Sequence, residues 1–171
     1  MSASRLLVAT AVLAGLAVPA TADAAKGHGS PARQQASFAP AKAATTAARR
    51  YWGATPCGGR VKLVTRARLG AGVDPSTSAW ATFATPMGAN NLAAPAAVYR
   101  NCSIFLARWR WPTTASMSED WDLLCATVIH ETGHLLGRTH DARRGSVMAP
   151  VFDDASHLPR ICRTMRPRAK R

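Results

Sequence analysis

Three of the chain's five histidines lie within residues 130–141, HETGHLLGRTHD. On a helix, residues four apart share a face, so His130 and His134 can present two imidazoles to one metal ion. A catalytic zinc site takes three protein ligands and keeps one position open. His140 can supply the third nitrogen if the chain reverses just after the helix. Gly137 stands where that reversal is required, because glycine readily adopts the left-handed conformation that ends a helix.

Glu131 directly follows the first of these histidines. At that position a carboxylate can reach a water molecule on the ion without itself binding the ion. Such a carboxylate can act as a general base, which a purely structural zinc site does not need. The spacing therefore predicts one catalytic Zn²⁺ ion held by His130, His134 and His140, with Glu131 as the base of a hydrolytic reaction.

The segment HETGHLLGRTH matches HExxHxxGxxH, so it resembles the zinc signature of the metzincin metallopeptidases. Metzincins have a methionine-bearing turn beneath the metal, and SVMAP follows here with Met148. The longer segment SVMAPVF is most similar to the matrixin branch, in which a Pro-x-Tyr after the methionine lines the specificity pocket. Pro150, Val151 and Phe152 occupy those positions. The resemblance implies a zinc endopeptidase whose pocket receives the substrate side chain after the scissile bond.

This resemblance covers residues 130–152, and the rest of the chain resembles small secreted bacterial matrixin-like proteins more loosely. The domain is shorter than a typical matrixin domain. No cysteine precedes Tyr51, so the cysteine-based latency of matrixins is not available. Only His28 and His157 lie outside the motif, which disfavours a second, structural zinc ion. Asp141 replaces the serine that is common after the third ligand, and we expect it to orient the turn or a ligand.

Two alternatives concern residues near the motif. His157 is a rival third ligand, but its distance from the helix makes His140 the more economical choice. Asp153 and Asp154 permit a calcium site, although paired acids in a solvated loop are common without one. Calcium is therefore unsupported.

The pattern of apolar residues predicts an α+β fold. Residues 61–69 and 101–109 alternate as strands, and residues 78–85 favour a strand although Asp74-Pro75 could begin a helix. One helix is expected over 118–137, capped by Ser116 or Ser118. We expect a minimal metzincin-like domain: a small twisted mixed β-sheet packed on one long active-site helix, with a loop-rich C-terminal part containing the methionine turn.

The N-terminal region has the composition of a targeting segment. Residues 1–24 carry one early arginine, an apolar run over 6–18 and Ala22-Asp23-Ala24, which predicts a secretory signal peptide. Cleavage after Ala22 and an uncleaved N-terminal anchor are the alternatives. Residues 25–50 are rich in Ala, Pro, Lys and Thr and predict a disordered linker or short pro-segment. The metallopeptidase domain is then expected over 51–165, followed by a basic tail, 166–171.

The four cysteines are widely spaced and include no Cys-x-x-Cys pair. In an oxidising, extracellular compartment this favours two disulfides over a thiolate metal site. Four cysteines permit three pairings. We favour Cys57–Cys102 with Cys125–Cys162, which joins the N-terminal half to itself and the helix to the C-terminus.

The formal net charge is +13 at pH 7. This charge and the basic tail permit binding to an anionic surface, although a solvated Arg-rich tail is the favoured explanation. No nucleic-acid-binding motif is present, and we expect no membrane insertion and a monomer. The leading hypothesis is a secreted, zinc-dependent endopeptidase acting on proteins or peptides. The alternatives are a zinc-bearing secreted binding protein with weak or no peptidase activity, and a small structural protein held by disulfides.

Overall fold

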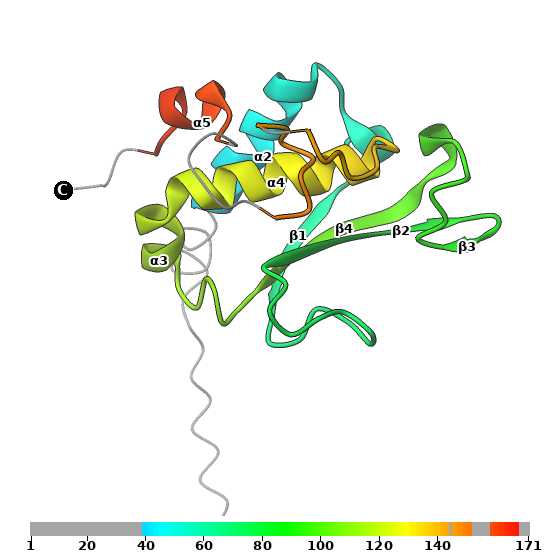
Figure 1. Cartoon of the computed structure of the whole chain (residues 1–171), viewed down its shortest axis with the longest axis horizontal. Coiled ribbons are helices and arrows are strands. Elements are labelled where there is room, and N and C mark those ends of the chain that lie inside the picture. The colour runs from blue at the N-terminus through cyan, green and yellow to red at the C-terminus, as the bar shows by residue number, and fades with distance from the viewer. Residues whose placement is uncertain (1–38, 144, 152–157, 168–171) are drawn as a thin grey trace, which may run out of the picture.

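The computed structural model describes residues 39–143, 145–151 and 158–167. Within them a four-stranded sheet has the order β1-β4-β2-β3. Strand β1 runs parallel to β4, whereas β2 is antiparallel to both β4 and β3. The helices α2 and α4 lie on one face of this sheet (Figure 1). The strands are β1 (Lys62–Arg66), β2 (Ala79–Thr85), β3 (Gly88–Ala89) and β4 (Arg100–Ala107).

This architecture confirms the predicted α+β class with a small mixed sheet under one long helix. All three predicted strands form, and residues 79–85 are a strand rather than a helix. In β2 the side chains of Ala79, Ala81 and Phe83 are buried, as expected for alternate residues facing the helix layer. Two 3₁₀ turns lie in the connections: η1 (Pro56–Gly59) between α2 and β1, and η2 (Ala96–Val98) between β3 and β4.

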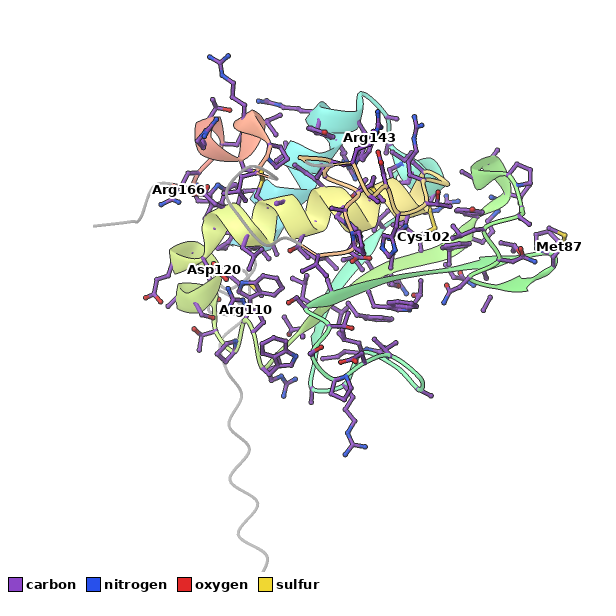
Figure 2. The ribbon with its side chains drawn as sticks, viewed as in Figure 1. Met87, Cys102, Arg110, Asp120, Arg143 and Arg166 are labelled. Carbon is purple, nitrogen blue, oxygen red and sulfur yellow. A yellow bond between two sulfur atoms is a disulfide. The ribbon has the colours of Figure 1, made fainter. Side chains whose placement is uncertain are left out.

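The predicted single helix over 118–137 is wrong at its start. A short helix α3 (Thr114–Glu119) precedes the long helix α4 (Trp121–Leu135), with a break at Asp120. Thr113 caps α3 in a reciprocal capping box with Ser116, so neither predicted serine is the N-cap. Asp120 at the break forms an ion pair with Arg110, 2.8 Å between Oδ2 and Nη2 (Figure 2). Helix α4 is buried along most of its length because it runs between α2 and the sheet.

Residues 39–50 are not a linker. They lie in helix α2 (Ala39–Trp52), which packs against α4 (Figure 1). Ala41, Ala44, Ala47 and Ala48 are buried on one face. Alanine has the highest helix propensity, and its small side chain lets two helices approach closely. The composition of this segment suggested disorder because the face that it buries consists mainly of small alanine side chains. The folded part of the chain begins at least as early as Ala39, while the predicted signal peptide lies outside the described residues.

Both predicted disulfides form. Cys57–Cys102 joins η1 to β4, and Cys125–Cys162 joins α4 to the short C-terminal helix α5 (Arg160–Thr164). The indole N–H of buried Trp121 donates to the carbonyl oxygen of Cys162 at 2.6 Å, beside the second bridge. Arg166, the first residue of the predicted basic tail, pairs with Asp122 of α4 at 2.6 Å. Residues 168–171 lie outside the described part. None of the described helices is long and apolar enough to span a membrane.

Removing the second bridge should lower stability. Replacement of both Cys125 and Cys162 by serine releases α5 from α4, and we expect the free energy of unfolding to fall by about 2–5 kcal/mol. Chemical denaturation of the double variant and the wild type measures this difference. An unchanged denaturation midpoint would show that α5 is held by its packing alone.

Candidate active site

Helix α4 and the loop after it bring the three predicted ligands together. His130, His134 and His140 each offer a ring nitrogen, and these atoms lie within 4.8 Å of one another. His130 is buried, His134 is half-buried and His140 is exposed. The cluster of three rings is therefore buried at His130 and exposed to solvent at His140.

Backbone carbonyls orient two of the rings. The Nδ1 atom of His130 lies 2.9 Å from the carbonyl oxygen of Val147, and Nδ1 of His134 lies 2.8 Å from that of Arg138. Carbonyl oxygens only accept hydrogen bonds, so both Nδ1 atoms carry the proton and the lone pair of each ring lies on Nε2. The two Nε2 atoms lie 3.1 Å apart. Two nitrogens bound tetrahedrally to zinc are ~3.3 Å apart, so this donor set fits the ion.

Burial keeps the imidazoles of His130 and His134 in the form that binds metal. It lowers the pKa of His130 to about 4, against the opposing effect of the Val147 carbonyl, and the two neighbouring histidines lower it further. The pKa of His134 is also lowered, again mainly by burial. A neutral imidazole is the metal-binding form, so at neutral pH both rings are ready to act as ligands.

Gly137 makes the chain reversal that brings His140 into reach. Its φ is 79°, in the left-handed region. The N–H of Gly137 donates to the carbonyl of His134 and that of Arg138 to the carbonyl of Gly133, both at 2.9 Å. This pattern is a Schellman motif. It also places the Arg138 carbonyl where His134 needs its acceptor, so the helix end and the orientation of His134 are fixed together.

The loop after His140 is tied to the predicted methionine turn. The N–H of Asp141 donates to the carbonyl of Met148 at 2.9 Å. The Asp141 carboxylate accepts hydrogen bonds from Arg143 (Figure 2) and from the hydroxyl of Ser146. These bonds, those to the Arg143 side chain first, lower the pKa of Asp141 to about 2. These bonds tie Asp141 to Ser146 and Met148, which is consistent with its expected role in orienting the turn.

Glu131 is buried beside the histidines, and its carboxylate faces the edge of the sheet. Oε2 accepts a hydrogen bond of 2.6 Å from the backbone N–H of Ala81 in β2. Burial raises the pKa of Glu131 to about 7, and the Ala81 N–H partly opposes this rise. The carboxylate is thus held in one orientation by a partner that is itself fixed in the sheet.

A cleft of about 880 Å³ runs along His130, Glu131, His134 and His140. Its other walls are largely apolar or hydroxyl-bearing and include Trp80, Leu92, Trp109, Leu123, Thr127, Pro150 and Val151. Two of the three predicted pocket residues, Pro150 and Val151, therefore border the cleft. Phe152, Asp153, Asp154 and His157 lie outside the described residues.

Gly133, between the two helical histidines, has no room for a side chain. A β-carbon built there would overlap the sulfur of Met148 and lie 2.9 Å from Cζ2 of Trp52. We expect Gly133→Ala to cost about 1–3 kcal/mol of stability, as overpacking in a core does, and to weaken metal binding. Thermal unfolding and zinc titration measure the two effects.

A matched control for that variant is Gly70→Ala. Gly70 is exposed, its φ is not left-handed, and a β-carbon there would meet Val73 at an ordinary 3.5 Å. If Gly133→Ala has the same unfolding temperature and zinc affinity as Gly70→Ala, helix α4 is not confined between Trp52 and Met148.

Two contributors to the site were missed at the sequence level. The Ala81 N–H is a backbone group, and only the fold shows which strand edge faces Glu131. Trp52 was expected at the start of the domain, but its place at the end of a helix formed by the predicted linker was not. A signal was present, since the spacing of Ala41, Ala44 and Ala48 continues helically to Trp52.

Comparison with known proteins supports the resemblance carried by the zinc signature. The model of the matrixin family (Peptidase_M10) matches residues 85–160, which include the three histidines, Glu131 and Met148. No curated protein and no solved structure matches the chain significantly. The match supports a metallopeptidase and implies zinc as its metal. Residues 85–160 of this chain are therefore matrixin-like, as the motif HETGHLLGRTH and the methionine turn predicted.

Proposed function

We propose that this chain is a secreted zinc endopeptidase that hydrolyses peptide bonds with Glu131 as general base. The observation that supports it best is the placement of three converging imidazoles and a buried carboxylate along one cleft. The family match over residues 85–160 supports the same reaction class. The two disulfides are consistent with an oxidising, extracellular compartment, and we propose residues 1–24 as the signal that directs secretion.

His130, His134 and His140, which border the cleft, would hold one zinc ion. When bound, zinc supplies a Lewis acid that lowers the pKa of a water molecule and stabilises negative charge on a peptide carbonyl oxygen. Glu131 accepts the proton of the attacking water and passes it to the departing amine nitrogen. The Ala81 N–H keeps the carboxylate directed into the cleft during both transfers.

The edge of β2 that faces away from β4 is the surface that we propose for an extended substrate. The carbonyl of Ser78 accepts from Ala107, so alternate residues from Ser78 turn their backbone groups toward β4. Ala79 and Ala81 therefore turn theirs away from β4. Strand β3 covers only Ala84 and Thr85 on that side. A substrate strand added beside residues 79–81 would bring its scissile bond past Glu131. Because the Ala81 N–H is donated to Glu131, the main-chain bonds that supply affinity would be those of Ala79 and of the Ala81 carbonyl oxygen.

We propose that Pro150, Val151 and Phe152 form the wall that receives the side chain after the scissile bond. Pro150 and Val151 border the cleft, which also offers Leu123 and Thr127 from α4. These groups carry no charge, so an apolar side chain is the preferred occupant.

Cleavage of a peptide library, read by mass spectrometry with and without a chelator, tests the proposed function. The expected result is chelator-sensitive cleavage before apolar residues. The alternative is a secreted zinc-binding protein with weak or no turnover, held through its basic tail to an anionic surface. Near-stoichiometric zinc with no cleavage of any library member would favour that alternative.

A further inference from the structure

Trp52, the last residue of α2, contacts helix α4 immediately before the first histidine. Its indole N–H donates to the carbonyl oxygen of Ile129 at 2.9 Å. Ile129 precedes His130, so this bond joins α2 to the peptide unit that carries the first proposed ligand. Helices α2 and α4 pack against each other, as Figure 1 shows.

The same indole approaches α4 one turn further along. A β-carbon built on Gly133 would lie 2.9 Å from Cζ2 of Trp52 and would overlap the sulfur of Met148. Trp52 and Met148 therefore both press on the helix at Gly133, which lies between His130 and His134 in the sequence. Because protein interiors are close-packed, this part of α4 has little freedom to shift relative to either residue.

A third contact links Trp52 to the end of the helix. The guanidinium carbon of Arg138 lies 5.8 Å from the centre of the Trp52 ring system, within the range of a cation–π contact. The backbone of Arg138 closes the Schellman motif on Gly133, and its carbonyl orients the ring of His134. Trp52 thus contacts α4 and its end at three places: at Ile129 before His130, at Gly133 between the two histidines, and at Arg138 after His134.

We propose that Trp52 is a positioning residue for the metal site, and that α2 remains part of the mature enzyme. This inference rests on the proposed function, because it takes His130 and His134 as zinc ligands. Any cleavage that matures the secreted chain must then lie upstream of Ala39, where α2 begins. A pro-segment removed on activation can include residues 25–38 but not the helix that ends at Trp52.

Zinc affinity, measured by competition with a coloured chelator, tests the positioning role without recourse to peptidase activity. Trp52→Phe keeps the aromatic packing and removes the N–H donor, and we expect it to weaken zinc binding about tenfold. Trp52→Ala also removes the packing against Gly133, and we expect a loss approaching 100-fold. The absorption spectrum of the cobalt-substituted protein should change as well, because it reports ligand geometry. Lys42→Ala, on the exposed face of the same helix, is the control and should bind zinc like the wild type.

The outcomes separate this inference from the proposed function. Wild-type zinc affinity and an unchanged cobalt spectrum in Trp52→Phe and Trp52→Ala would overturn the positioning role and leave the peptidase proposal intact. If Trp52→Ala does not fold, the affinity and spectrum of Trp52→Phe decide. A wild-type chain that binds no zinc would overturn both. The N-terminus of the secreted, active protein, read by mass spectrometry, tests the cleavage limit: a residue no later than Ala39 is expected, and any later residue would contradict it.

Discussion

Glu131→Gln is expected to lower kcat/KM for peptide hydrolysis by about 10²–10⁴-fold while leaving zinc binding unchanged. The glutamine has the same shape, and its carbonyl oxygen can still accept the hydrogen bond from the Ala81 N–H. It cannot accept a proton from water, however. The three histidine nitrogens that would hold the ion are not altered. Initial rates on a fluorogenic peptide, together with the zinc content of the same preparation, measure both parts of the prediction.

The control for this variant is Glu119→Gln, which makes the same chemical change at an exposed residue at the end of α3. We expect it to keep wild-type activity. If Glu131→Gln cleaves the peptide as fast as Glu119→Gln, then Glu131 is not the base and another group must take the proton. If Glu131→Gln loses its zinc, the carboxylate has a role in holding the ion.

His140→Ala is expected to reduce zinc affinity by more than the 10–100-fold that outer-sphere changes produce, and to abolish hydrolysis. His140 is the clearest ligand to remove because it is exposed. Replacement of His130 would also break its bond to the Val147 carbonyl inside the core. Zinc titration against a competing chelator measures the loss of affinity. In excess chelator the variant and the wild type should unfold at the same temperature, because the packing does not depend on this ring.

A His140→Ala protein that binds zinc as tightly as the wild type would contradict the assignment of the third ligand. His157 would then be the next residue to replace, since it is the rival considered from the sequence. Loss of zinc from His140→Ala but not from His157→Ala would exclude that rival.

The parts of the site that follow from local sequence were predicted well. The i, i+4 spacing of His130 and His134 required only that the segment be helical, and α4 is a helix. The reversal at Gly137 required only a left-handed residue at the helix end. The pairing of the four cysteines is also the one that the sequence favoured.

The parts that depend on contacts distant in sequence were missed or misplaced. Residues 39–50 were expected to be disordered because alanine contributes little hydropathy, yet a stripe of small side chains suits close packing on α4. The bond from Ala81 to Glu131 joins residues fifty positions apart and uses a backbone group that sequence patterns do not mark. The capping box of Thr113 begins a separate short helix, and that helix ends at Asp120, whose φ of −95° and ψ of 32° are not helical.

The most direct test of the central claim follows peptide cleavage and zinc content together in one wild-type preparation. If the three histidines hold a catalytic ion, this preparation contains about one zinc ion per chain, loses cleavage when a chelator removes the zinc, and recovers cleavage when zinc is added back. Cleavage that persists after the zinc has been removed would contradict the account. So would a chain that holds its zinc and cleaves no peptide.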